Sequence, residues 1–263
     1  MRLQESRITR LGVLFSTSSL ALRFHSCLIT RNEYEAQDLR SIEIKVPSDM
    51  TQSYVSPGQY CQIVKQDVSG FYAIRSPPYQ DSNTFSFICK ITEGNHVLTM
   101  AEPGSEVQVS EPQGYGYRIS KFFDKYKFDF PTTHIMMVAC GSGVAPIAAA
   151  IDSGVLGFKT TSYNSLFERR GVLYLGVKSE KHIPCKDEFK RWEDSGILVV
   201  PICSQATKEW QGRKGYVQDA IKSDMVDVPR NTGAILSGPR GMVKEVKSLL
   251  LESGVFEGRI LLA

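Results

Sequence analysis

One stretch decides the fold: residues 134–146, HIMMVACGSGVAP, in which an apolar run leads directly into two glycines and a proline. Further apolar runs of strand length follow at 172–177, 197–202, 234–237 and 260–262, and helical patterns lie between them at 146–154, 186–195, 216–222 and 242–254. Continuous apolar runs are typical of parallel strands that are buried on both faces. The alternation of strand and helix therefore predicts a doubly wound, parallel α/β domain over residues 131–263.

The part of the chain before Pro131 has a different hydrophobic period. Apolar and polar residues alternate in short runs, as at 42–46 and 85–91, and Pro-Gly or Pro-Pro pairs at 57–58, 77–78 and 103–104 separate the runs. Such period-two runs are typical of antiparallel barrels and sandwiches. We therefore predict an antiparallel β-barrel domain over residues 27–130, with a connecting segment at 118–131.

The composition is that of an ordinary globular protein. The chain has 263 residues, a little under two domains at the usual ~150 residues each. Hydrophobic residues make up 42% and charged residues 22%, which argues against a disordered chain or a membrane bundle. The formal net charge of +3 arises within residues 1–26, where four arginines face Glu5 alone, and the rest of the chain is balanced. We therefore expect no nucleic-acid partner.

Residues 1–26 have the composition of a targeting segment. They are basic, rich in Ser and Thr, and poor in acidic residues. Their uncharged stretch at 11–22 is too short and too polar to span a bilayer, and we expect no transmembrane segment elsewhere. The pattern favours an organellar transit peptide. A secretory signal fits less well because no small-x-small cleavage site follows the apolar residues, and an ordinary N-terminus stays an alternative.

The six cysteines, at 27, 61, 89, 140, 185 and 203, form no CxxC pair and no metal-ligand spacing. We therefore expect reduced thiols, with neither a disulfide scaffold nor a metal site. The chain also has no Cys-x4-Cys-x2-Cys run, so it brings no plant-type iron–sulfur cluster of its own.

Three strand ends carry residues that suit a dinucleotide, which binds at the carboxyl ends of parallel strands. The first strand ends at Gly141-Ser142-Gly143, where a glycine backbone and a helix start suit a diphosphate, although a tight strand-to-helix turn explains the same residues. The third ends at Ser204-Gln205, followed by Lys214 and Tyr216, which suit a phosphate and an adenine or form a plain polar loop. The fourth ends at Gly238-Pro239-Arg240-Gly241-Met242, again a glycine turn before a helix.

Over about residues 27–263 the chain resembles the ferredoxin–NADP reductase superfamily, and in particular the plastid FAD/NAD(P)-binding oxidoreductase-like proteins of plants. The motifs that carry the resemblance are PGQY at 57–60, FYAIRSP at 71–77, EPQG at 111–114, GSGVAP at 141–146 and GPRGM at 238–242. DEFKRWE at 187–193, VPICSQ at 200–205 and GYVQ at 215–218 resemble the plant subgroup. The resemblance implies FAD on the barrel, NADP or NAD on the sheet, and hydride transfer between them. Electrons would then pass to an external acceptor, a protein or a small molecule.

The resemblance also implies roles for individual residues. Tyr72, Ala73 and Ser237 would stand where the two rings react, with Tyr72 stacked on the flavin or, alternatively, a half-buried barrel aromatic. The implied FAD-binding residues are Tyr60, Tyr72, Ala73, Ile74, Arg75, Cys89, Lys90, Ile91, Gly94, Asn95, His96 and Val97, of which His96 is either a phosphate donor or a solvated loop residue. The implied nucleotide-binding residues are Gly141, Ser142, Gly143, Pro146, Ser204, Gln205, Lys214, Tyr216, Gly238, Pro239 and Met242.

Four departures from the family pattern concern these sites. Gly70 stands where the family has the arginine of the flavin diphosphate, Ala73 where it has a serine, and Ser237 where it has a cysteine, and the C-terminal aromatic is missing. A lost charge-assisted contact costs about 1.5–3 kcal/mol, and Arg75 is the candidate substitute. The alternative function is therefore a non-catalytic module with a degenerate flavin site that binds nucleotide or a protein partner.

Coenzyme and compartment remain choices between two candidates each. Ser204, Lys214 and Tyr216 favour NADPH over NADH, although Gln205 stands where an arginine often follows the serine. The family resemblance favours a plastid, while residues 23–26 look equally like the end of a mitochondrial presequence.

Overall fold

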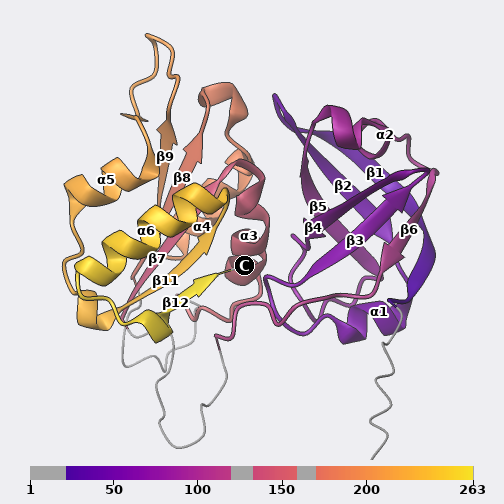
Figure 1. Ribbon diagram of the computed structural model, residues 1–263, viewed down its shortest axis with the longest axis horizontal. Coiled ribbons are helices and arrows are strands. Elements are labelled where there is room, and N and C mark those ends of the chain that lie inside the picture. The colour runs from indigo at the N-terminus through magenta and orange to yellow at the C-terminus, as the bar shows by residue number, and fades with distance from the viewer. Residues whose placement is uncertain (1–21, 120–132, 159–169, 263) are drawn as a thin grey trace, which may run out of the picture.

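The computed structural model describes residues 22–119, 133–158 and 170–262, and these residues form two sheets that lie side by side (Figure 1). Most of the expected targeting and connecting segments, and the expected domain boundary at 130/131, lie outside the described residues. Strand β1 (Phe24–Ala36) begins within the last residues of 1–26, because Phe24 to Ser26 pair with β6 (Glu106–Ser110). A targeting role for residues 1–26 stays a prediction.

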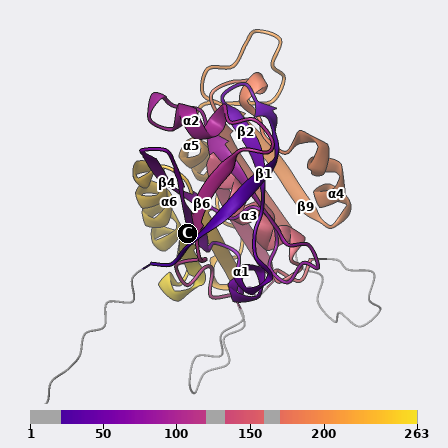
Figure 2. The same ribbon diagram turned by 90° about the vertical axis from the view of Figure 1, so that its right-hand side faces the viewer.

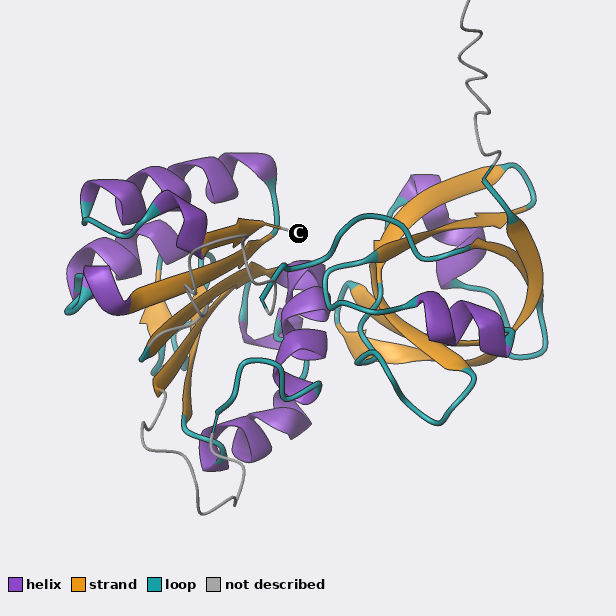
Figure 3. Ribbon diagram, turned by 90° about the horizontal axis from the view of Figure 1, so that it is seen from below, coloured by secondary structure: helices purple, strands orange, loops and turns teal. Residues whose placement is uncertain are grey.

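The first sheet has six antiparallel strands in the order β4-β3-β6-β1-β2-β5. The strands not yet introduced are β2 (Leu39–Lys45), β3 (Tyr60–Lys65), β4 (Val68–Ala73) and β5 (Thr84–Lys90). The edge strands meet, because Ile74 bridges to Phe87 and the Arg75 N–H donates to the Ser86 carbonyl. The sheet therefore closes into the predicted barrel (Figure 3), with the short helices α1 (Ser48–Ser53) and α2 (His96–Thr99) beside it.

Alternating side chains fill the barrel. Ile42 of β2 and Phe87 of β5 are fully buried. Ser41 and Glu43, which flank Ile42, and Ser86, which precedes Phe87, are partly exposed. Tyr54 packs edge-on against Phe85 with ring centroids 5.6 Å apart, and its hydroxyl donates to the Ser76 carbonyl at 2.9 Å. The apolar half of the period-two pattern thus faces the core.

The second sheet is parallel, with the strand order β10-β9-β8-β7-β11-β12. Its strands are β7 (His134–Cys140), β8 (Arg170–Val177), β9 (Ile197–Cys203), β10 (Arg213–Lys214), β11 (Thr232–Ser237) and β12 (Ile260–Leu262). Five of them lie on the predicted apolar runs. The sixth, β10, has only two residues, both polar and exposed, and so gives no hydrophobic signal.

Helices cover both faces of this sheet (Figure 1). Helices α3 (Val144–Asp152) and α4 (Phe189–Asp194) bury Ile147 and Trp192 in one cluster with Met137 of β7. Helices α5 (Val217–Asp224) and α6 (Arg240–Glu252) bury Ile221 and Val246 in a second cluster with Val138 of β7. Because neighbouring residues of β7 face opposite clusters, the sheet is buried on both sides, and the predicted doubly wound fold is confirmed.

Direct contacts hold the barrel against the α3 face of the sheet. Leu39 and Ile88 of the barrel are buried in the same cluster as Ile147 of α3. At the hairpin between β1 and β2, the Gln37 N–H donates to the Lys181 carbonyl at 3.0 Å, and the Glu35 carboxylate accepts a bond from the Cys185 N–H at 2.6 Å. Seen along the line that joins the two sheets, the barrel stands in front of the parallel sheet (Figure 2).

Within the described ranges, no helix has both the length and the apolar character that crossing a membrane requires. The same residues contain no cluster of His, Cys, Asp and Glu side chains arranged to hold a metal ion. All six cysteines are free thiols, and only Cys140 is not fully buried.

Candidate functional site

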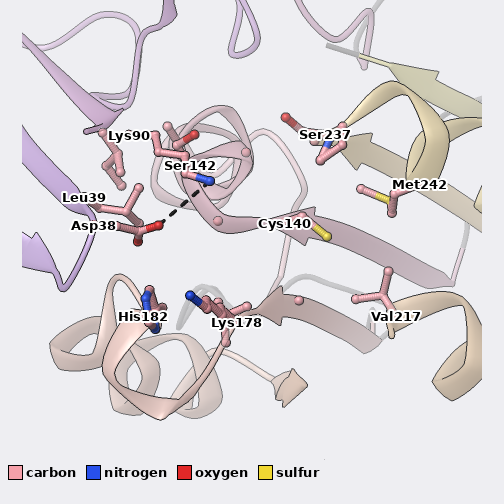
Figure 4. Close-up of a pocket in the computed structure, with 18 of the residues that line it drawn as sticks. Asp38, Leu39, Lys90, Cys140, Ser142, Lys178, His182, Val217, Ser237 and Met242 are labelled. Atoms are coloured by element: carbon pink, nitrogen blue, oxygen red, sulfur yellow. Dashed lines mark ion pairs between the residues drawn. The ribbon is translucent and has the colours of Figure 1, made fainter. Parts of the chain in front are cut away.

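A cleft of about 890 Å³ lies between the barrel and the parallel sheet. The sheet lines it with the carboxyl ends of β7, β8, β9 and β11, where ligands of open parallel sheets bind. Figure 4 shows Asp38, Leu39 and Lys90 of the barrel facing Lys178 and His182 of the sheet domain. The volume lies within the roughly 300–1,000 Å³ that is typical of cofactor sites.

The turn after β7 brings backbone to the floor of the cleft. Gly141, Ser142 and Gly143 form a single 3-10 turn, η2 (Gly141–Gly143), before α3 begins. Gly141 has a φ of 53°, and a Cβ on Gly143 would lie 2.6 Å from the Ser237 carbonyl oxygen. The turn therefore packs directly on the end of β11, with no room for a side chain at residue 143.

The turn after β11 lies beside it. A Cβ on Gly238 would come within 2.7 Å of the Met242 methyl group and 3.2 Å of Cys140 Cβ, and its φ is 151°. Ser237, Pro239 and Met242 line the cleft next to this glycine. The two glycine turns, far apart in sequence, thus form one continuous wall.

The barrel side of the cleft is made of side chains. A Cβ on Gly70 would lie 2.6 Å from the Tyr72 hydroxyl oxygen, so the Tyr72 ring covers Gly70. Burial raises the pKa of Tyr72, and a hydrogen bond with Asn95 opposes that rise. Because the Tyr72 ring occupies this space, an arginine side chain at residue 70 would clash with it. This explains why residue 70 is a glycine here, where the family has an arginine.

The ends of β8 and β9 form a third part of the cleft. The Ser204 N–H donates to the Val177 carbonyl at 3.0 Å, and the Gln205 N–H donates to the Lys178 carbonyl at 2.7 Å. This pairing places the Ser204 hydroxyl near Lys178, with the exposed ring of Tyr216 on the same wall. The arrangement suits a ribose or phosphate beside a stacked base.

The structure brings 14 of the 24 expected site residues to the cleft. Those that line it are Tyr72, Ala73, Lys90, Asn95, Gly141, Ser142, Gly143, Pro146, Ser204, Tyr216, Ser237, Gly238, Pro239 and Met242. Those that do not are Tyr60, Ile74, Arg75, Cys89, Ile91, Gly94, His96, Val97, Gln205 and Lys214. Ile74 and Cys89 differ from expectation because their side chains face the barrel core. Lys214 differs because β10 carries it to the exposed sheet edge.

Arg75 differs most from the expectation that it replaces the diphosphate-binding arginine. Its Nη1 lies 3.1 Å from Asp152 Oδ2 of α3, and its Nη2 pairs with Glu188 Oε1 just before α4. The Arg75 side chain is 16% exposed and that of Asp152 is 9% exposed. Asp152 also accepts a bond from Trp192 Nε1 at 3.1 Å and pairs with Arg191 at 2.8 Å. The guanidinium thus joins the barrel to the sheet domain and does not line the cleft.

Several residues of the cleft are absent from the sequence predictions. The principal ones are Asp38, Leu39, Ile88, Thr92, Lys178, His182, Gln218 and Glu245. Lys178 directly follows the apolar run 172–177, so its place at a strand end was readable. Asp38 comes from the β1–β2 hairpin, and the Lys90 ammonium lies 3.9 Å from its carboxylate. Only the docking of the barrel brings that hairpin to the cleft.

Comparison with known proteins agrees with this geometry. A family profile described as "Oxidoreductase NAD-binding domain" matches residues 137–248. Fruit protein pKIWI502 of Actinidia deliciosa is 28% identical over 232 residues, which cover 84% of this chain and 69% of that protein. A ferredoxin–NADP reductase of Thermosynechococcus vestitus is 28% identical over 178 residues, which cover 64% of this chain and 42% of that enzyme.

Among solved structures, a ferredoxin NADP+ reductase from Neisseria gonorrhoeae with bound FAD and NADP has the same two-sheet fold. It gives a TM-score of 0.71 at 17% identity and covers 91% of this chain and 98% of that one. Residues 137–248 therefore match an oxidoreductase NAD-binding domain, and the chain as a whole is similar to the ferredoxin–NADP reductase-like FAD/NAD(P)-binding oxidoreductases in sequence and in fold. The matched residues include all of the parallel sheet except the start of β7 and the strand β12.

Proposed function

We propose that this protein is an FAD-dependent NAD(P)H oxidoreductase that passes electrons from a nicotinamide nucleotide to an external acceptor, a protein or a small molecule. The observation that carries the proposal is the single cleft in which Tyr72 and Ala73 of the barrel share a chamber with Ser237 and the two glycine turns of the sheet. Hydride transfer depends mainly on holding the nicotinamide ring against the flavin ring. This cleft has one wall from the barrel and one from the parallel sheet.

The barrel wall would hold the flavin. The half-buried Tyr72 ring offers a flat apolar face, and Ala73 next to it leaves room for a ring system. Since Arg75 is paired with Asp152 and Glu188, we assign the diphosphate contact to Lys90, whose exposed ammonium lies 3.9 Å from the Asp38 carboxylate. The hydroxyl of Thr92 and the amide of Asn95 lie on the same wall. A bound flavin supplies the step between two-electron and one-electron transfer, which the protein's own side chains cannot perform.

The sheet wall would hold the nicotinamide nucleotide. The backbone at Gly141 and Gly143 lets a diphosphate approach the start of α3, since the N-terminus of a helix suits an anion. The Tyr216 ring suits an adenine, and Ser204 with Lys178 suits the ribose and its 2′-phosphate. We therefore favour NADPH over NADH, with Lys178 in the role that the sequence suggests for Lys214.

The purified protein tests the proposal directly. We expect a yellow protein with flavin absorbance, or one that binds added FAD, and loss of that absorbance when NADPH is added without oxygen. A colourless protein that FAD cannot reconstitute rejects the enzyme proposal. Tyr72→Ala should weaken FAD binding, with Tyr34→Ala, an exposed barrel tyrosine outside the cleft, as the control. Unchanged FAD affinity in Tyr72→Ala contradicts our placement of the flavin ring.

A second candidate is a non-catalytic module that binds a nucleotide or a protein partner. The ion pairs of Arg75 favour it, because they engage the candidate substitute for the diphosphate-binding arginine that is missing at Gly70. Calorimetric titration separates the two candidates. Micromolar binding of NADP+ together with no binding of FAD supports the module, whereas binding of both supports the enzyme.

We also propose that residues 1–26 direct the protein to an organelle, a plastid or a mitochondrion. Their basic, hydroxyl-rich composition supports this proposal. A fluorescent protein fused after residue 26 should enter an organelle, and Arg2, Arg7 and Arg10 changed together to Glu should prevent entry. Cytosolic fluorescence of the unaltered fusion rejects the proposal.

A further inference from the structure

Tyr117 carries a hydroxyl that packing does not explain. The residue is 2% exposed and lies between the last barrel strand and the parallel sheet. Its hydroxyl oxygen is buried and has no hydrogen-bond partner of normal geometry among the residues that the structure describes. A buried hydroxyl without a partner costs free energy, and phenylalanine would fill the same space without that cost. Packing alone therefore does not explain why residue 117 is a tyrosine.

The barrel holds this tyrosine rigidly. Its N–H donates to the Pro57 carbonyl at 2.6 Å, and its carbonyl accepts a bond from Ser56 Oγ at 2.9 Å. Its ring lies on Gly58, where a Cβ would come within 3.1 Å of ring carbon. Gly58 and Gly116 have φ values of 92° and 60°, so both flanking turns need glycine. Because backbone and ring are fixed, the direction of the hydroxyl is fixed too.

The neighbour of that hydroxyl is Ser237. Tyr117 is buried in one cluster with Ala139 and Ile235, and Ala139 is the register partner of Ser237 in the parallel sheet. Burial raises the pKa of Tyr117, and the adjacent Ser237 side chain opposes that rise. Ser237 is 8% exposed, ends β11, and lines the cleft beside the two glycine turns. A phenol anchored in the barrel thus reaches a serine of the nucleotide-binding domain.

We propose that Tyr117 is a positioning residue for Ser237: when a nicotinamide nucleotide is bound, the phenol donates a hydrogen bond to Ser237 Oγ, and the Ser237 proton points into the cleft toward the carboxamide oxygen of the nicotinamide. A serine hydroxyl has one proton and two lone pairs, so a donor behind it leaves its proton for the ligand. No bond breaks in this arrangement. The inference rests on the proposed function, because it places the nicotinamide end of the nucleotide at Ser237.

Calorimetric titration with two ligands tests this arrangement in the full chain. NADP+ carries the nicotinamide, and 2′-phospho-ADP-ribose lacks it. Tyr117→Phe should weaken NADP+ binding about three- to tenfold, the effect of one lost hydrogen bond, and leave 2′-phospho-ADP-ribose binding unchanged. Ser237→Ala should do the same, and the double variant should be no weaker than either single variant.

Equal NADP+ affinities of Tyr117→Phe and the unaltered protein overturn the inference, as does an equal loss for both ligands. An unaltered protein that binds neither ligand instead overturns the proposed nucleotide binding itself. Tyr54→Phe is the matched control, because this buried tyrosine donates to the Ser76 carbonyl inside the barrel, away from the cleft. Tyr54→Phe should lower the thermal midpoint and leave both affinities unchanged, whereas Tyr117→Phe should leave the thermal midpoint unchanged or raise it.

Discussion

The two walls of the cleft are built from different parts of the chain. At its centre the sheet wall is backbone, because the turns at Gly143 and Gly238 pack against neighbouring atoms with no room for a side chain. The barrel wall consists of side chains, among them Tyr72, Lys90 and Asn95. A substitution in the backbone part would move a strand end. In the barrel wall one side chain can replace another, as where the Tyr72 ring fills the space beside Gly70. Substitutions in the two walls should therefore have different consequences.

The largest effect is expected for Gly143→Ala in the sheet wall. The added Cβ would lie 2.6 Å from the Ser237 carbonyl oxygen, which belongs to the backbone of a buried strand, so the turn itself must move. We expect NADP+ binding, measured by calorimetric titration, to weaken by about a hundredfold, since an ångström-scale shift of this turn removes several backbone contacts at once.

Gly241→Ala is the matched control for that variant. Gly241 also lines the cleft, but an added Cβ there meets nothing within 4 Å and the residue has no strained φ. It should bind NADP+ within about twofold of the unaltered protein and gain slightly in helix stability, because it lies in the first turn of α6. Equal losses of NADP+ affinity in the two glycine variants would show that the close packing of Gly143 on Ser237 is not needed for binding.

A smaller effect, on stability, is expected for Arg75→Gln at the junction behind the barrel wall. The change leaves Asp152 and Glu188 without their shared guanidinium, although Arg191 still contacts both. We expect the free energy of unfolding in urea to fall by about 2 kcal/mol, less than for an isolated buried pair. FAD affinity should not change. A tenfold loss of FAD affinity with normal stability would place Arg75 at the phosphate after all.

The loss in Arg75→Gln should also depend on pH. Burial raises the pKa of Glu188, and the charge of Arg75 opposes that rise. Without Arg75 the folded-state pKa of Glu188 lies further above the ordinary value of 4.5, so the folded state binds more protons than the unfolded state and loses stability as pH rises through that pKa. The deficit relative to the unaltered protein should therefore be smaller near pH 5 than at pH 8. An equal deficit at both values would show that Glu188 is not the group left uncompensated.

The sequence predicted the sheet wall better than the barrel wall, and the reason is physical. A glycine turn after an apolar run is local, so residues 134–146 define both a strand and the ligand-facing backbone at its end. The partners of Arg75 stand 77 and 113 residues away, and only the docking of the two domains brings them together. Both sheets follow from hydrophobic periods. The strand β10 has no such signal and forms only by pairing with β9, and the hairpin at Asp38 reaches the cleft only because the barrel docks on the sheet domain. The sequence gives no such signal for Lys178, because Ser179 and Glu180 follow it and no glycine turn leads from its strand into a helix.

The smallest effect is expected for Lys178→Ala, which tests which lysine of the sheet domain contacts the 2′-phosphate of the coenzyme. Lys178 lines the cleft near Ser204, whereas Lys214 lies on the exposed edge strand β10. A 2′-phosphate held by an exposed ammonium adds roughly 1 kcal/mol, so the KM for NADPH should rise about fivefold in Lys178→Ala while the KM for NADH stays unchanged. Lys214→Ala, which removes the same charge outside the cleft, should leave both values within about twofold. The reverse result, a higher KM for NADPH in Lys214→Ala alone, would contradict this assignment. It would show that Lys214 of β10, and not Lys178 at the end of β8, binds the 2′-phosphate.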